Sequence, residues 1–310
     1  MNPYIRTVFY VSKVLNLIPT KITKNRNIYK FNKISVPKLI INTFFHSFCN
    51  IMYFLNCFLF VSANMKENVK KYGAYFLAVA SSICHIAVIS VCTIYGNKIF
   101  DLVFCSQSFV YFQLARKKES YKEIIFITAI AFLLLFLNSV NSIYLFVISN
   151  YLFMITYCTW YVMIISINVT CLHFTTIMQH LKIIIEKINY LFSKMQIKPT
   201  AVSSVRTTKC NFMKHKTEIH KIKLLMKYYC ILCNSTVEIN RIYSPIMLII
   251  AAKMFVVATY FTLIIQNYIF LKDETDIYTI FNFLTWSGLE IVTFYTVLYA
   301  CSSFVKEVRQ

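Results

Sequence analysis

The segment from Ile124 to Leu181 contains no lysine, arginine, aspartate or glutamate. As one continuous helix it would be roughly 87 Å long at about 1.5 Å per residue, whereas the hydrocarbon core of a bilayer is only about 30 Å thick. The segment therefore has to cross a bilayer twice. We place the turn near Ser149 and Asn150, which gives predicted spans at 124–147 and 151–176.

Four further segments are apolar and long enough to cross a bilayer, which needs about 20 residues. They lie at 39–63, 72–95, 245–271 and 279–301. Charged residues make up only 14% of the chain, against about a quarter in a soluble domain. The sequence therefore predicts an all-α, multipass transmembrane helical bundle with six spans.

The basic residues between the spans predict the orientation of the chain. The segments 1–38, 96–123, 177–241 and 302–310 together hold 27 lysines and arginines, and the alternate segments hold four. Because positive loops stay in the cytoplasm, the amino terminus is predicted to be cytoplasmic. The predicted organisation is a cytoplasmic segment at 1–38, spans one to four within 39–176, a long basic cytoplasmic segment at 177–241, spans five and six within 242–301, and a cytoplasmic end at 302–310 that we expect to be truncated.

The net charge of +20 does not indicate a nucleic-acid partner, because the basic residues are distributed between apolar spans and form no compact basic domain. The sequence contains no GxSxG, HExxH or Walker-type motif, and no catalytic residue, metal site or cofactor is expected. Asn168-Val-Thr170 matches a glycosylation sequon, but it lies inside a predicted span. The partners predicted from these features are the lipid bilayer and a small molecule.

Lys253 and Glu290 are the two charged residues inside the predicted spans, and intramembrane charges mark candidate functional sites. An antiparallel arrangement of spans five and six around Thr275 would separate the two by roughly 10 Å in depth. The sequence therefore predicts no tight ion pair. We expect Lys253 to extend towards the cytoplasmic surface and Glu290 to face the bundle interior, with Tyr260 or water as its hydrogen-bond partner.

A second group of polar and aromatic residues falls in the outer halves of the predicted spans. An apolar pocket with a few convergent polar groups is typical of small-molecule sites, although single tyrosines and tryptophans are more often interfacial anchors. With Glu290, the candidate ligand-binding residues are Asn138, Asn141, Tyr157, Trp160, Tyr260, Gln266 and Trp286.

Two sequence stretches resemble the insect gustatory receptor family. The run from His220 to Tyr229, followed by Cys233 to Pro245, is similar to the amphipathic segment that leads into that family's fifth helix. The run from Thr259 to Asn267 matches the family signature of Thr-Tyr, five residues and Gln-Phe in all but the last residue. That signature belongs to a seventh helix, whereas this match lies in the fifth span, so we interpret it as coincidental.

The resemblance implies a chemosensory receptor of the plasma membrane that detects small-molecule tastants. It also implies a homo- or hetero-tetramer of related subunits that forms a ligand-gated cation channel, with the seventh helices lining the pore. The predicted sixth span is followed by only nine residues, so we expect the final helix to be missing. An odorant receptor of the same superfamily and an unrelated six-span transporter remain alternatives.

Overall fold

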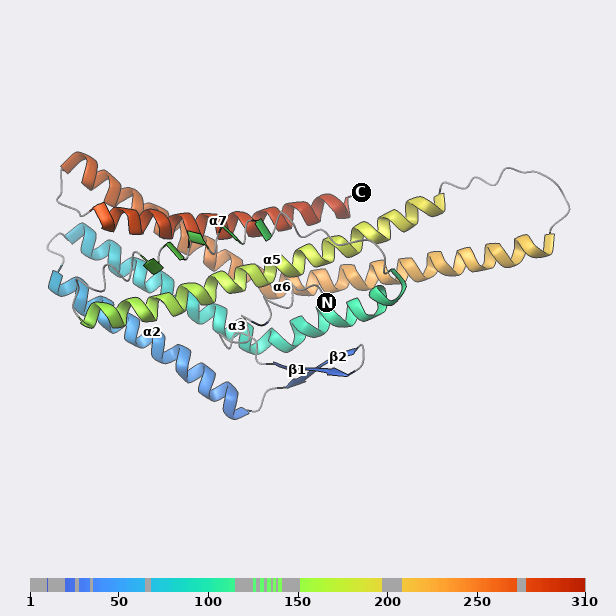
Figure 1. Ribbon diagram of the computed structural model, residues 1–310, viewed down its shortest axis with the longest axis horizontal. Helices are drawn as coiled ribbons and strands as arrows, with labels where there is room; N and C mark the ends of the chain where they lie inside the picture. The colour runs from blue at the N-terminus through green and yellow to red at the C-terminus, as the bar shows by residue number, and fades with distance from the viewer. Residues whose placement is uncertain are drawn as a thin grey trace.

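The computed structural model describes residues 20–25, 28–33, 36–64, 68–114, 151–196, 208–271 and 277–309, together with Tyr10 and ten helical residues between 125 and 140. Within these residues the chain forms a two-stranded hairpin and five long helices (Figure 1). The helices are α2 (Val36–Asn64), α3 (Asn68–Leu114), α5 (Tyr151–Gln196), α6 (Thr208–Leu271) and α7 (Ile277–Val308).

Five of the six predicted spans fall inside these helices. The predicted spans at 39–63, 72–95, 151–176, 245–271 and 279–301 lie within α2, α3, α5, α6 and α7 in that order. The predicted third span at 124–147 lies mostly outside the described residues. Among the described residues, four helical segments are long and apolar enough to cross a bilayer, at 71–96, 158–194, 219–266 and 284–308.

Helix α2 carries several polar residues within its apolar sequence. Asn42, His46, Asn50 and Asn56 share one face of the helix, and each is buried against the rest of the bundle. The opposite face is exposed and apolar: its residues repeat at intervals of three and four, namely Ile41, Phe44, Phe48, Ile51, Leu55 and Phe58. A helix with polar groups inside and large apolar groups outside is typical of a bundle whose exterior is lipid.

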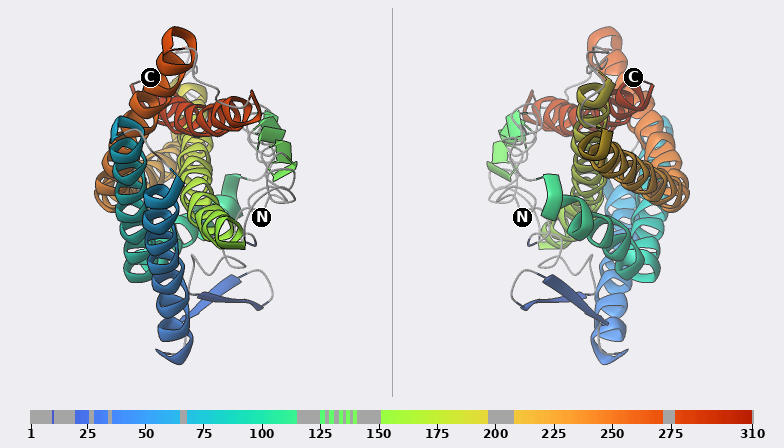
Figure 2. Two further views of the ribbon diagram at one scale, coloured as in Figure 1. Left: turned by 90° about the vertical axis from the view of Figure 1, so that its left-hand side faces the viewer. Right: turned by 90° about the vertical axis from the view of Figure 1, so that its right-hand side faces the viewer.

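Helix α5 is the central element of the bundle. It contacts α2, α3, α6 and α7, and Figure 2 shows it in the middle of the end-on view. Nearly every residue from Met163 to Ile185 is buried, including polar ones such as Thr170 and His173. Because α5 is enclosed by neighbouring helices, its polar side chains can be satisfied inside the protein without facing lipid.

The predicted basic segment at 177–241 is largely helical. Helix α5 continues to Gln196 and α6 begins at Thr208, so the two helices extend together beyond the end of α7 (Figure 1). Helix α6 has 64 residues and is therefore roughly 96 Å long, about three times the thickness of the hydrocarbon core. A single helix thus links the predicted fifth span to the basic extension.

A short β-hairpin is the one departure from the predicted all-helical fold in the described residues. Strand β1 (Thr20–Asn25) pairs antiparallel with β2 (Ile28–Lys33), with Ile22 opposite Phe31. Strand β2 also contacts α3. The segment 1–38 was predicted only to be cytoplasmic, and its frequent lysines obscure the short alternating pattern of a strand.

Candidate functional site

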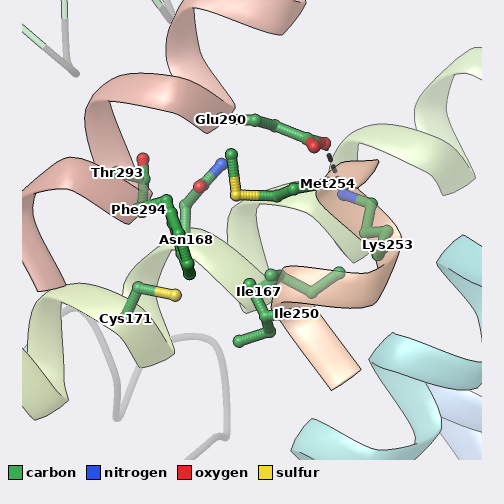
Figure 3. A pocket seen from close by; sticks show the side chains of 9 residues that line it. All are labelled: Ile167, Asn168, Cys171, Ile250, Lys253, Met254, Glu290, Thr293 and Phe294. Carbon is green, nitrogen blue, oxygen red and sulfur yellow. Dashed lines mark hydrogen bonds and ion pairs between the residues drawn. The ribbon is translucent and has the colours of Figure 1, made fainter. Parts of the chain in front are cut away.

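Lys253 of α6 and Glu290 of α7 form a buried ion pair, in which Lys253 Nζ donates to Glu290 Oε1. Lys253 is 3% exposed and Glu290 is 7% exposed. The prediction that these residues would be too far apart, with Lys253 directed to the surface, is therefore wrong. It assumed two straight antiparallel helices lying side by side, whereas the last part of α6 crosses α7 at an angle (Figure 1). The side chains of Lys253 and Glu290 therefore meet between the two helices (Figure 3).

Each charge of this pair depends on the other. An unpaired charge in the low-dielectric interior of a membrane protein costs several kcal/mol, and pairing with good geometry offsets that cost. The second carboxylate oxygen, Glu290 Oε2, is buried and has no hydrogen-bond partner among the described residues. The pair therefore leaves one strong acceptor available inside the bundle.

A small cavity lies beside the ion pair, between α5, α6 and α7 (Figure 3). The cavity volume is about 10 Å³, which is enough room for one water molecule. Most of its wall is apolar. The nine residues that line it are Ile167, Asn168, Cys171, Ile250, Lys253, Met254, Glu290, Thr293 and Phe294.

Asn168 supplies the second polar group of this cavity. Its side chain comes from α5, and in Figure 3 its amide nitrogen points towards the side of the cavity on which Glu290 lies. The Nδ2 atom is buried and makes no hydrogen bond to any described residue. The cavity thus has an available acceptor on α7 and an available donor on α5.

An aromatic cluster lies one helical turn from the ion pair. Trp286 precedes Glu290 by four residues on α7, so both side chains project from the same face of the helix. The Trp286 ring lies 4.8 Å from the Trp160 ring and 5.0 Å from the Tyr161 ring, between ring centres. Ile164 and Leu289 are buried in the same cluster. A pocket with aromatic walls beside a few polar groups is typical of small-molecule sites.

Tyr260 lies elsewhere in the bundle, against Gly73 of α3. A Cβ atom built on Gly73 would lie 2.6 Å from both Cδ2 and Cε2 of the Tyr260 ring, which is closer than van der Waals contact. Tyr260 is buried, so its ring has little room to withdraw. The close approach of α3 and α6 at this point therefore requires glycine.

Gly73→Ala is accordingly expected to destabilise the protein by about 1–3 kcal/mol, the usual cost of overpacking a core. The measurement is thermal or denaturant unfolding of the purified protein in lipid nanodiscs. Gly288→Ala is the matched control, because a Cβ atom there would make ordinary van der Waals contact with the Leu134 side chain, at 3.8 Å from Cδ1 and 4.0 Å from Cδ2. Equal stability of the two variants would contradict the described packing of Tyr260.

The structure brings together three of the predicted ligand-binding residues. Trp160, Trp286 and Glu290 lie around the junction of α5 and α7, and Tyr260 is buried beside α3. Gln266 is exposed on α6. Asn138 and Asn141 lie outside the described residues, as does the side chain of Tyr157, whose backbone belongs to α5.

Sequence reasoning missed two residues of this site. Lys253 was recognised as an intramembrane charge but not as the partner of Glu290, because the helix crossing is not encoded in local sequence. Asn168 was considered only as part of a sequon. Its position in the uncharged segment 124–181 was a usable signal, since a buried amide in a membrane span needs a partner.

A separate buried polar cluster joins α2 to α3. Asn50 Nδ2 donates to the His46 carbonyl oxygen, at 2.9 Å, and lies 2.8 Å from His85 Nδ1. Because the amide nitrogen is a donor, His85 Nδ1 accepts and the ring carries its proton on Nε2. The His46 and His85 rings meet edge to face with their centres 5.2 Å apart. This cluster contributes specific hydrogen bonding to the α2–α3 interface.

Long apolar helices around a buried ion pair, with large apolar side chains on the outside, define a helical-bundle membrane protein. The profile of the 7tm chemosensory receptor family matches residues 5–310, and the chain belongs to this family. No curated protein matches the chain at a significant level. The predicted resemblance to the chemoreceptor family is therefore confirmed over almost the whole chain.

Proposed function

We propose that this chemosensory receptor is a gustatory receptor that detects small-molecule tastants as a subunit of a ligand-gated cation channel. The observation that carries the proposal is the cavity between α5, α6 and α7, with a buried ion pair and an aromatic cluster beside it. A family of chemosensory receptors needs such a concave site inside the bundle, where a small molecule is removed from competing lipid and water.

Ligand binding at this cavity would change how α6 and α7 pack. A ligand group that bonds to Glu290 Oε2 enters beside the ion pair, and so favours an arrangement in which α6 and α7 lie further apart. Only a ligand with different affinities for the two arrangements shifts their populations. Because α6 is continuous from Thr208 to Leu271, a small rotation at Lys253 displaces the far end of the helix.

The α7 helix offers a second connection from the site to the basic extension. Near its carboxyl end the carbonyl oxygen of Glu307 accepts a hydrogen bond from Asn189 Nδ2 of α5, at 3.1 Å. Lys98 of α3 and Glu238 of α6 also form an exposed ion pair at 2.7 Å. In the proposed receptor these contacts carry the rearrangement to the cytoplasmic side, where the subunits of a homo- or hetero-tetramer would respond.

The experiment is expression of the chain, alone and with related receptor subunits, in the plasma membrane of cultured cells. Whole-cell currents are recorded while soluble tastants and volatile odorants are applied as separate panels. We expect inward cation currents that depend on a soluble tastant. Currents evoked only by volatiles would favour an odorant receptor, and surface expression without any ligand-evoked current would contradict the channel proposal.

A further inference from the structure

The polar groups around the cavity place narrow limits on what can bind there. Glu290 Oε2 is an ionised acceptor without a partner among the described residues, and Asn168 Nδ2 is a donor without one. Lys253 Nζ uses one of its three donors on Glu290 Oε1. Thr293 Oγ1 donates its proton to the Leu289 carbonyl oxygen, at 2.8 Å. An occupant therefore has to donate to a carboxylate and accept from an amide at the same time.

Few chemical groups meet both requirements. An ammonium group has no acceptor for Asn168 and is repelled by Lys253, whereas a carboxylate is repelled by Glu290. An ether or aldehyde oxygen accepts but has no proton to give to Glu290. A hydroxyl group is neutral, donates one hydrogen bond and accepts up to two, and so satisfies the carboxylate and the amide together.

The rest of the cavity limits the number of hydroxyl groups. Apart from the polar groups already named, the wall is formed by Ile167, Ile250, Met254 and Phe294, with the Cys171 thiol beside them. A second or third hydroxyl would be buried against these apolar side chains without a hydrogen-bond partner, which is unfavourable. The aromatic cluster one turn away is mainly apolar and suits a hydrocarbon body.

We propose that the cavity binds the single hydroxyl group of a small monohydric alcohol or phenol, held between Glu290 Oε2 and Asn168 Nδ2. This inference rests on the proposed function, and it names the class of tastant. The hydrocarbon body lies towards Trp160 and Trp286. Entry of a body larger than one water molecule requires α6 and α7 to move apart, which is the rearrangement proposed for gating.

The protein carries its own reporter of this site. Trp160 and Trp286 are its only tryptophans, and their rings pack against each other beside the cavity. A ligand that enters changes the surroundings of both rings. Intrinsic tryptophan fluorescence of the full chain in lipid nanodiscs therefore measures binding without any channel activity.

The test titrates this fluorescence with hexan-1-ol, its methyl ether, hexanal, hexylamine, hexanoate and glucose. We expect a saturable change with hexan-1-ol and at least about tenfold weaker responses to the others, because each lacks one hydrogen bond or adds an unpaired polar group. Asn168→Leu should weaken hexan-1-ol binding about tenfold while the protein stays folded. Thr259→Val, which removes an exposed hydroxyl elsewhere on α6, should leave it unchanged.

Two results would overturn the inference. One is equal binding of hexan-1-ol and its methyl ether; the other is an Asn168→Leu variant that melts like the wild type and binds the alcohol equally well. Failure of the proposed function looks different. Saturable, hydroxyl-dependent binding in nanodiscs combined with electrically silent cells would contradict the channel and support the site. Currents evoked by glucose or an amine, without alcohol selectivity in nanodiscs, would support the receptor and overturn the site.

Discussion

Lys253→Met is expected to lower the free energy of unfolding by about 3–5 kcal/mol, because it leaves Glu290 as an unpaired charge in the bundle. Lys253 is 3% exposed, so solvent screens little of this cost. The measurement is equilibrium or thermal unfolding of the purified protein in nanodiscs, with surface expression in cells as a second readout. Met preserves most of the hydrocarbon stem of lysine, so the loss is assigned to charge and not to packing.

The double variant Lys253→Met/Glu290→Gln supplies the decisive comparison. Removing both charges of a buried pair is often neutral, whereas removing one is costly, so the double variant should recover most of the lost stability. Lys98→Met serves as a control for charge removal in general. Its ion pair with Glu238 is exposed, and its loss should be too small to resolve. If Lys253→Met were as stable as Lys98→Met, the buried pair would be contradicted.

Trp286→Ala is expected to destabilise the protein by about 3–5 kcal/mol through the cavity that it leaves. The Trp286 side chain is 3% exposed and packs against Trp160 and Tyr161. Because both partners lie on α5, the substitution should loosen the α5–α7 contact. Unfolding in nanodiscs measures the loss, and Trp286→Phe should recover part of it by keeping one ring.

The matched control for this variant is Tyr295→Ala on the same helix. Tyr295 is 59% exposed, and substitutions at exposed sites usually change stability by less than about 0.5 kcal/mol. The two variants thus compare removal of an inward ring and an outward ring from α7. Similar losses at both positions would show that the face of α7 that carries Trp286 is not the buried one.

The positions of most of the described helices were accessible from sequence. The uncharged segment 124–181 required two crossings, and helix α5 begins at Tyr151, immediately after the predicted turn. The positions of α2, α3, α6 and α7 followed from the lengths of the other apolar segments, since a bilayer sets a minimum length for each span. Membership of a chemosensory receptor family was predicted from the stretch at 220–245 on α6.

The candidate site was predicted only in part. Trp160, Trp286 and Glu290 were recognised from residue type, because aromatic and ionisable side chains in spans are rare or interfacial. Their proximity, and the roles of Lys253 and Asn168, depend on how α6 crosses α7 and on how α5 is enclosed. Crossing angles depend on the ridges and grooves that many side chains form together, so they cannot be predicted from any single residue.

The structure also explains why Gln266 was a misleading candidate. It was selected because it is polar and lies in the outer half of a span, yet it is exposed on α6, whereas Tyr260, six residues earlier, is buried against Gly73. Because each residue of a helix is rotated by about 100° from the one before, residues six positions apart project from different faces of the helix. Polarity alone therefore did not determine which face of α6 is inside.

The central claim is that this receptor binds its ligand between α5, α6 and α7. Photolabelling tests this claim most directly. A diazirine analogue of hexan-1-ol is photolysed with the protein in nanodiscs, with and without excess hexan-1-ol, and the labelled residues are mapped by mass spectrometry. The account predicts competed labelling within 160–171, 250–254 and 286–294, which line the cavity and the aromatic cluster. Competed labelling confined to other segments, such as the α2–α3 interface around His46 and His85, would contradict it.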